Sequence, residues 1–158
     1  MLGEDHPDTL SSACHLAEAL CGVGEQERAR QLNEDTFARF RRALGEHHPW
    51  TLASAGSLAV DLRALGEYEQ ARQLNEDTFA RYPRVLGEDH PWTLASAGSL
   101  AVDLRALGEY EQARQLNEDT LVRTRRVLGE DHPWLSLGGF ASDLRALVIT
   151  SRPGSVED

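Results

Sequence analysis

Short segments that combine carboxylates with an imidazole recur four times and are the best candidates for metal chemistry in this chain. They read Glu-Asp-His-Pro or Glu-His-His-Pro and end at Pro7, Pro49, Pro91 and Pro133. Carboxylate and imidazole groups are ordinary ligands of Zn²⁺. However, neighbours in one loop rarely converge on one ion, and each segment precedes a proline that suits the first position of a helix. We therefore expect helix caps, with no bound metal and no cofactor, although His47 and His48 could take up a metal weakly.

Nucleophilic side chains are present, but no catalytic grouping accompanies them. Ser57 and Ser99 recur with no histidine at helical spacing, and the adjacent Cys14 and His15 would point to different faces of a helix. On a helix, Cys14 and Cys21 would lie about 10 Å apart along the axis, which is too far for a disulfide. We therefore expect reduced thiols in a cytoplasmic protein. With no phosphate-binding glycine loop either, the chain is predicted not to be an enzyme.

The charge balance limits the classes of partner. The formal net charge is −10, whereas a nucleic-acid-binding protein needs a basic face. The longest apolar run is too short to cross a bilayer, and no signal peptide is recognisable at the start. We therefore expect a protein or peptide partner, with no nucleic acid and no membrane.

The elements that carry these residues are repeated every 42 residues. Residues 44–85 and 86–127 differ at only five positions, 2–43 is a diverged copy, and 128–150 is a partial one. Such a period predicts a solenoid in which each unit buries its apolar face against its neighbours. We treat 1–150 as a single array and expect 151–158 to be a disordered tail. The irregular ends suggest a portion of a longer array.

Each repeat is predicted to form two helices and no strand. In the second repeat, apolar residues at helical spacing favour a first helix over about 49–65 and a second over about 67–86. Gly66 and Gly87 suit the left-handed conformation of helix C-caps, and Pro83 should break or kink the last turn. Acidic residues open the second helices and arginines close them, which suits the helix dipole. Ion pairs one turn apart are expected at Asp35–Arg39, Asp77–Arg81 and Asp119–Arg123.

The order of large, small and aromatic residues resembles a known family. The second repeat reads Leu58-Ala59, Leu62, Gly66, Tyr68 and Ala71; the third reads Leu100-Ala101, Leu104, Gly108, Tyr110 and Ala113; the first keeps Leu16-Ala17, Leu20, Gly24 and Ala29 but has Gln26 for the aromatic. This pattern is similar to the tetratricopeptide repeat, whose usual period is 34 residues. The longer period resembles the variant found in kinesin light chains and in many bacterial proteins, so a bacterial source is expected. Asn75 and Thr78 depart from the 34-residue pattern.

The resemblance implies an all-α, right-handed α–α superhelix of about seven helices that serves as a scaffold for protein–protein interaction. The first helix of each repeat would line a concave groove that binds a peptide or an acidic protein segment. The groove positions implied for the first repeat are Ser11, Cys14, His15, Glu18, Cys21 and Gly22. Those predicted to bind the partner are Trp50, Ala53, Ser57, Val60, Arg63, Trp92, Ala95, Ser99, Val102, Arg105, Trp134 and Arg145. Arg63, Arg105 and Arg145 would form an arginine ladder.

Two alternatives stay open at this point. Trp50, Trp92 and Trp134 could be anchors for a partner, since binding hot spots favour tryptophan, or they could pack against the neighbouring repeat and stiffen the joint between units. The chain could also be a structural, self-assembling array with no groove ligand. In that case homo-oligomers would form through exposed apolar terminal helices, with Phe140 and Leu144 in the contact.

Overall fold

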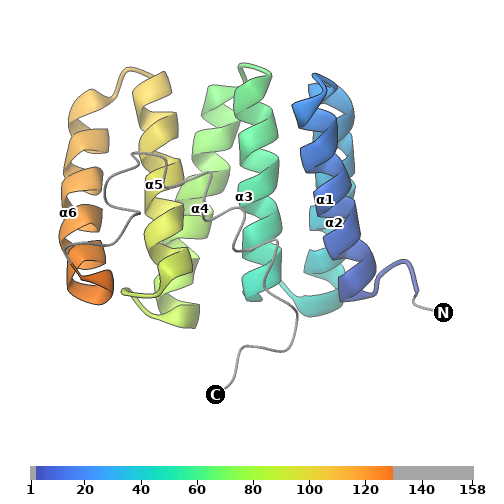
Figure 1. Cartoon of the computed structure of the whole chain (residues 1–158), viewed down its shortest axis with the longest axis horizontal. Helices are drawn as coiled ribbons and strands as arrows, with labels where there is room; N and C mark the ends of the chain where they lie inside the picture. Colours follow the sequence, from blue (N-terminus) through green and yellow to red (C-terminus); the bar gives the residue numbers. More distant parts are fainter. Residues whose placement is uncertain (1–2, 130–158) are drawn as a thin grey trace.

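Each 42-residue unit folds as a pair of adjacent helices in the computed structural model, which describes residues 3–129. The helices are α1 (Pro7–Gly22), α2 (Gln26–Leu44), α3 (Pro49–Ala64), α4 (Tyr68–Leu86), α5 (Pro91–Ala106) and α6 (Tyr110–Leu128). Each helix packs against the next, and α3 also contacts α1 and α5. In Figure 1, α1, α3 and α5 face the viewer, with α2 and α4 behind them. Over residues 3–129 the chain is all-α, as predicted, and the expected seventh helix lies outside these residues.

Within residues 3–129, the histidine of each Glu-Asp-His-Pro or Glu-His-His-Pro segment caps a first helix, as predicted. The Nδ1 atoms of His6, His48 and His90 accept hydrogen bonds from the backbone N–H two residues later, at 3.1 to 3.2 Å. A proline begins each of these helices. Between residues 3 and 129, no group of three or more histidine, cysteine or acidic side chains is placed to hold a metal ion. The described segments therefore serve as helix starts.

This capping should make stability depend on pH near neutrality. Burial lowers the pKa of both His48 and His90 below the ordinary value of 6.5. The stabilisation by these neutral imidazoles is therefore complete above pH 6.5 and is lost as the pH falls through the lowered pKa. We expect His48→Ala/His90→Ala to cost about 1 kcal/mol per cap at pH 8 and less at pH 5. Urea denaturation at both pH values checks this, and an equal cost at both would contradict it.

Both helices of the second repeat end as predicted, at Gly66 after α3 and at Gly87 after α4, except for the effect expected of Pro83. Gly66 and Gly87 have φ values of +81° and +95°, where glycine is favoured. The expectation that Pro83 breaks the last turn of α4 is wrong, because α4 continues to Leu86. The backbone N–H of Gly87 donates to the carbonyl of Pro83 at 3.0 Å. Proline removes only its own N–H from the helix, and its fixed φ is itself helical.

The core repeats with the sequence. Leu58, Ala59 and Leu62 of α3 pack with Ala71 of α4, and Phe37 of α2 lies against them. The equivalent group in the next repeat is Leu100, Ala101, Leu104 and Ala113, with Phe79 against it. Ala59 and Ala71 are completely buried, so the helices approach closely where the sequence has small residues.

No helix within residues 3–129 is both long and apolar enough to cross a bilayer.

The arginines near the ends of the second helices do more than match the helix dipole. The three predicted ion pairs one turn apart are present. The arginines also reach back to the acidic residues that precede the first helix of the same repeat. These pairs are Arg39–Glu4, Arg42–Asp5, Arg81–Glu46, Arg123–Glu88 and Arg126–Asp89. Each exposed pair contributes about 0–1 kcal/mol at most, so their main effect is to hold these segments in place.

Candidate protein-binding surface

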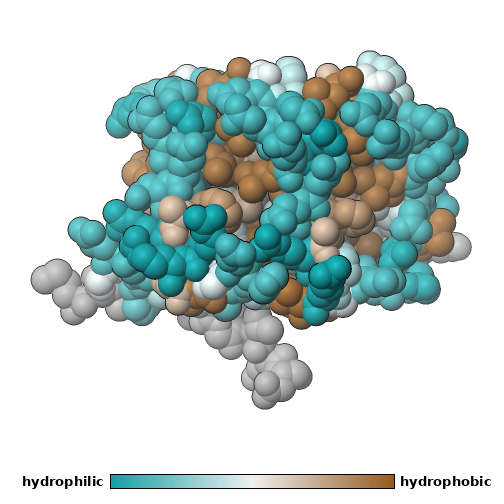
Figure 2. Space-filling view, turned by 180° about the vertical axis from the view of Figure 1, so that it is seen from behind, coloured by the Kyte–Doolittle hydropathy of each residue, from teal (hydrophilic) through white to brown (hydrophobic). Residues whose placement is uncertain are grey.

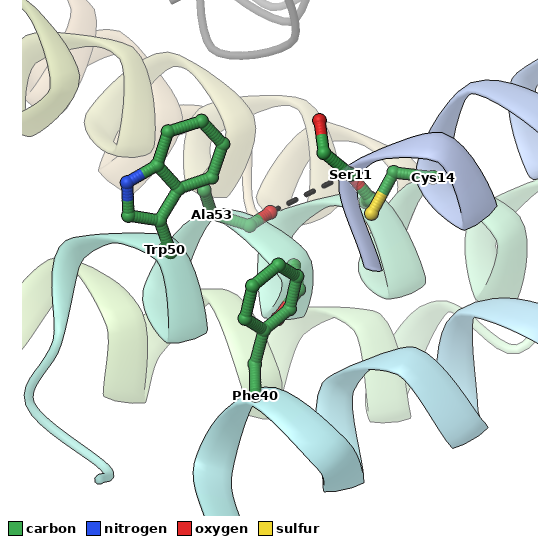
Figure 3. Close-up of a pocket in the computed structure, with 7 residues that line it drawn as sticks. Ser11, Cys14, Phe40, Trp50 and Ala53 are labelled. Carbon is green, nitrogen blue, oxygen red and sulfur yellow. Dashed lines mark hydrogen bonds between the residues drawn. The ribbon is translucent and has the colours of Figure 1, made fainter. Parts of the chain in front are cut away.

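The predicted groove residues of the first two repeats meet at one shallow pocket. Its lining combines Ser11 and Cys14 of α1 with Phe40 of α2 and with Trp50, Ala53, Ser54 and Ser57 of α3 (Figure 3). The pocket encloses about 290 Å³, part of which is open solvent. The Ser57 hydroxyl donates to the carbonyl of Ala53 at 3.4 Å, within its own helix. The surface therefore offers small side chains over an aromatic wall.

The same small residues recur along the neighbouring helix. Ala53, Ser57 and Val60 of α3 are half-buried, and so are the equivalent Ala95, Ser99 and Val102 of α5. The core residues of the same two helices are buried, whereas these positions keep some exposure. α3 and α5 thus present the same strip of small, half-buried residues. Trp134 and Arg145, the two predicted binding residues of the partial repeat, lie outside the described residues.

Trp50 is a packed residue at the joint between repeats. Its side chain is 8% exposed and stacks on Phe40 of the preceding α2, with ring centroids 6.4 Å apart. Trp92 meets Trp50 edge to face at 6.1 Å and packs in the same way against Tyr82 of α4 at 6.4 Å. The Tyr82 hydroxyl lies 3.5 Å from the carbonyl of Pro49. These contacts support the joint interpretation, while Trp50 also lines the pocket.

Arg63, a predicted member of the arginine ladder, is engaged inside the protein. Its Nε donates to Oδ1 of Asp103 at 2.7 Å, and its side chain is 18% exposed. Asp103 lies on α5 and is completely buried. Its other oxygen accepts from Nδ2 of Asn75 on α4 at 2.5 Å. This cluster of Arg63, Asn75 and Asp103 joins three helices at the second junction, the contact of α3 and α4 with α5. Arg105, by contrast, is exposed.

The first junction, the contact of α1 and α2 with α3, has the same cluster with one exchange. Asp61 of α3 is completely buried and accepts from Nδ2 of Asn33 on α2 at 2.5 Å. In place of an arginine, the Sγ of Cys21 on α1 donates to Asp61 at 3.0 Å. The buried carboxylate of the first junction therefore has a thiol where that of the second has a guanidinium.

Sequence reasoning missed these aspartates. Their signal was a charged residue inside an otherwise apolar helix face, next to Leu62 and Leu104. Burial raises the pKa of Asp103 above its ordinary 3.8, although Asn75 and Arg63 both act to lower it. Desolvation of the carboxylate thus outweighs its partners. This cost makes the clusters sensitive points of the fold.

Comparisons with known proteins agree with the repeat pattern. Family models described as tetratricopeptide repeat match residues 8–84 and 93–133. A crystal structure of nearly identical TPR-like repeats, described as a putative kinesin light chain from Podospora anserina, is 30% identical. The match covers 94% of this chain and 74% of the Podospora anserina chain, with a TM-score of 0.70. The chain belongs to the tetratricopeptide repeat family.

A glutamine-to-methionine variant of the same Podospora anserina protein is equally similar. It is 30% identical, with a TM-score of 0.72, over 94% of this chain and 73% of that one. No curated protein sequence matches the chain. The comparisons support a tetratricopeptide repeat protein of kinesin light chain type, but they do not support the expected bacterial source. Proteins of this family act in protein–protein interaction, and their repeats are generally non-catalytic.

The departures from the 34-residue tetratricopeptide pattern have structural roles. Asn75 donates to the buried Asp103. The Thr78 hydroxyl donates to the carbonyl of Leu74 at 2.8 Å, and Thr78 is itself buried. Polar residues therefore stand at the helix contacts where the shorter repeats prefer an aromatic and an alanine. Asn75 and Thr78 thus each make a hydrogen bond, as a buried polar side chain requires.

The opposite face of this tetratricopeptide array carries two further hollows that sequence reasoning did not identify. Figure 2 shows hydrophobic surface between hydrophilic ridges on this face. One hollow of about 310 Å³ has Phe37 and Thr78 in its lining, and the equivalent one of about 440 Å³ has Phe79 and Thr120. Their charged rims are internally paired, as in Arg81–Asp77 and Arg123–Asp119. The two equivalent hollows show that the repeat also shapes the face of the array on which the second helices, α2, α4 and α6, lie.

Proposed function

We propose that this chain is a binding scaffold that takes up an extended segment of a partner protein along α1, α3 and α5. The observation that carries the proposal is the strip of small, half-buried residues repeated on α3 and α5 beside the shallow pocket. Small side chains leave room for an incoming chain, and the pocket offers Trp50 as an apolar contact. The family supports a protein partner, and the net charge of −10 disfavours nucleic acid.

The segment is proposed to carry a carboxylate that pairs with Arg105. Arg105 is the exposed member of the arginine ladder among the described residues, whereas Arg63 is occupied by Asp103. A guanidinium binds a carboxylate through two parallel hydrogen bonds. Among the described residues of the ladder, the proposal therefore assigns partner binding to Arg105 of the third repeat and not to Arg63. We place this binding in the cytoplasm.

Short phage-displayed peptides selected on the intact chain provide the test. We expect the enriched peptide to lose about tenfold in affinity, or about 1.4 kcal/mol, with Arg105→Ala and to depend less on salt. Ser57→Tyr/Ser99→Tyr should block binding, because both changes fill the strip. Fluorescence anisotropy measures the affinities.

Matched control variants make the same kinds of substitution on the opposite face of the array. Arg125→Ala and Ala80→Tyr change exposed residues of α6 and α4 and should leave affinity unchanged. If the strip variants bind as well as the original chain while helicity is retained, the proposed surface is wrong. If Arg105→Ala alone has no effect, only the carboxylate pairing is wrong.

Self-assembly is the competing proposal, supported by the exposure of Leu16 on α1. Leu16 is 55% exposed, whereas the equivalent Leu58 is 7% exposed beneath its neighbours. However, α1 has Ala19 where α3 and α5 have the buried Asp61 and Asp103. α1 therefore lacks the carboxylate that α3 and α5 offer to an asparagine of the preceding helix. A mass by light scattering that grows with concentration would favour assembly. Phe140 and Leu144, the expected contact residues, lie outside the described part of the chain.

A further inference from the structure

The first junction contains a buried carboxylate without the cation that its counterpart has. Asp61 and Asp103 are both completely buried, and both accept from an asparagine of the preceding helix. Asp103 also has the guanidinium of Arg63, whereas Asp61 has the thiol of Cys21. A buried carboxylate is costly unless a cation or several donors compensate it. Asp61 is therefore the less compensated of the two.

A second observation at the same place points to a missing donor. The Oδ1 atom of Asn33 is buried and has no hydrogen-bond partner, and the whole residue is 1% exposed. Its amide nitrogen already donates to Asp61. Asn33 and Asp61 thus present acceptors that outnumber their donors. A guanidinium carries five N–H donors in a planar fork and suits such a cluster.

Among the three described repeats, the groove next to this junction is acidic only in the first. Glu18 stands on α1 where α3 and α5 have Val60 and Val102, and Glu18 is exposed. Cys21 stands where those helices have Arg63 and Arg105. At this pair of positions the second and third repeats each have a valine and an arginine, whereas the first repeat has a glutamate and a cysteine. A cationic group arriving along the groove would be attracted to this end.

We propose that the first junction is a subsite for an arginine side chain of the bound partner segment, which pairs with Asp61 and Asn33 and passes Glu18. The second junction shows that the geometry is possible. There the guanidinium of Arg63 keeps 18% exposure of its side chain and still reaches the fully buried Asp103 at 2.7 Å. The Cys21 thiol carries no positive charge, so in this proposal the cation comes from the bound segment. The incoming group displaces the thiol hydrogen bond.

This inference rests on the proposed use of the groove and adds a direction to it. The arginine of the partner lies over the first repeat and its carboxylate lies near Arg105. A segment bound in the opposite direction would place like charges together at both ends, and such contacts oppose binding. The two charges thereby select one orientation of the segment.

The probe is N-acetyl-arginine amide, titrated into the ¹⁵N-labelled full chain and followed by NMR. We expect saturable shifts at the side-chain amide of Asn33 and the backbone of Cys21. N-acetyl-citrulline amide, a neutral analogue of similar shape, should bind at least about tenfold more weakly. Cys21→Arg should abolish the shifts because it fills the subsite from within. Cys21→Ser keeps a short donor and should retain them, and Glu18→Val should weaken them and reduce their salt dependence.

Three results would overturn the subsite. They are no shift at Asn33 in a folded chain, equal binding of the citrulline analogue, and unchanged binding by Cys21→Arg. The arginine probe reports on the first junction without any peptide at Arg105. A positive result with no selected peptide would therefore retain the subsite and reject the wider groove proposal. Selected peptides that bind the Cys21→Arg chain unchanged would reject the subsite alone.

Discussion

Replacing Trp50 by alanine should lower the free energy of unfolding by about 3–5 kcal/mol, the usual cost of deleting a packed aromatic. Trp50 belongs to one buried cluster with Leu10 and Phe40, and Trp92 contacts its edge. The indole therefore links α1 and α2 of the first repeat with α3 of the second repeat, and through Trp92 it also contacts the third repeat. Urea denaturation followed by circular dichroism measures the loss.

Tyr110→Ala is the matched control for Trp50→Ala. Tyr110 is 69% exposed, so its removal should change stability by no more than about 0.5 kcal/mol. A Trp50→Ala chain that unfolds at the original urea concentration but no longer binds the selected peptide would contradict the joint interpretation. It would show instead that the indole acts as an anchor for the partner.

The helices were predictable because residues close in the sequence determine where each helix begins and ends. Pro49 and Gly66 mark the two ends of a helix within a few residues, and the caps depend on neighbours such as His48. Helical spacing also predicted the buried face of α3 that carries Leu58 and Leu62, whereas Leu16, at the position of Leu58 in the first repeat, is exposed. Pro83 misled the prediction because the energetic cost of one lost backbone bond does not by itself end a helix.

The contacts between repeats could not be predicted in the same way. Asn75 lies 28 residues from Asp103 in the sequence, and Arg63 lies 40 residues away. No helical periodicity relates such positions, so the exposed arginine ladder and the buried cluster fit the sequence equally well. Trp50 was ambiguous for the same reason, since its stacking depends on where Phe40 is placed by the preceding helix.

Replacing Asp103 by alanine should lower the free energy of unfolding by about 3 kcal/mol, the lower end of the cost of removing one partner of a buried ion pair. The change would leave the Arg63 guanidinium without its acceptor and the amide of Asn75, which is 1% exposed, without an oxygen. Arg63 keeps some contact with water, which limits the loss. Urea denaturation measures it, and a loss below about 0.5 kcal/mol would contradict the role of the cluster.

Asp103→Asn separates the charge from the shape, because an amide retains an oxygen that can accept from Arg63. Burial raises the pKa of Asp103 above 3.8, so the folded chain holds this proton in a range where the unfolded chain has released it. The stability that the folded chain gains by holding this proton is therefore complete below pH 3.8 and is lost as the pH rises through the raised pKa. The asparagine variant has no such loss, so its stability relative to the original chain should increase from about pH 4 to pH 7. A constant or decreasing difference over that range would show that Arg63 and Asn75 outweigh desolvation at this carboxylate.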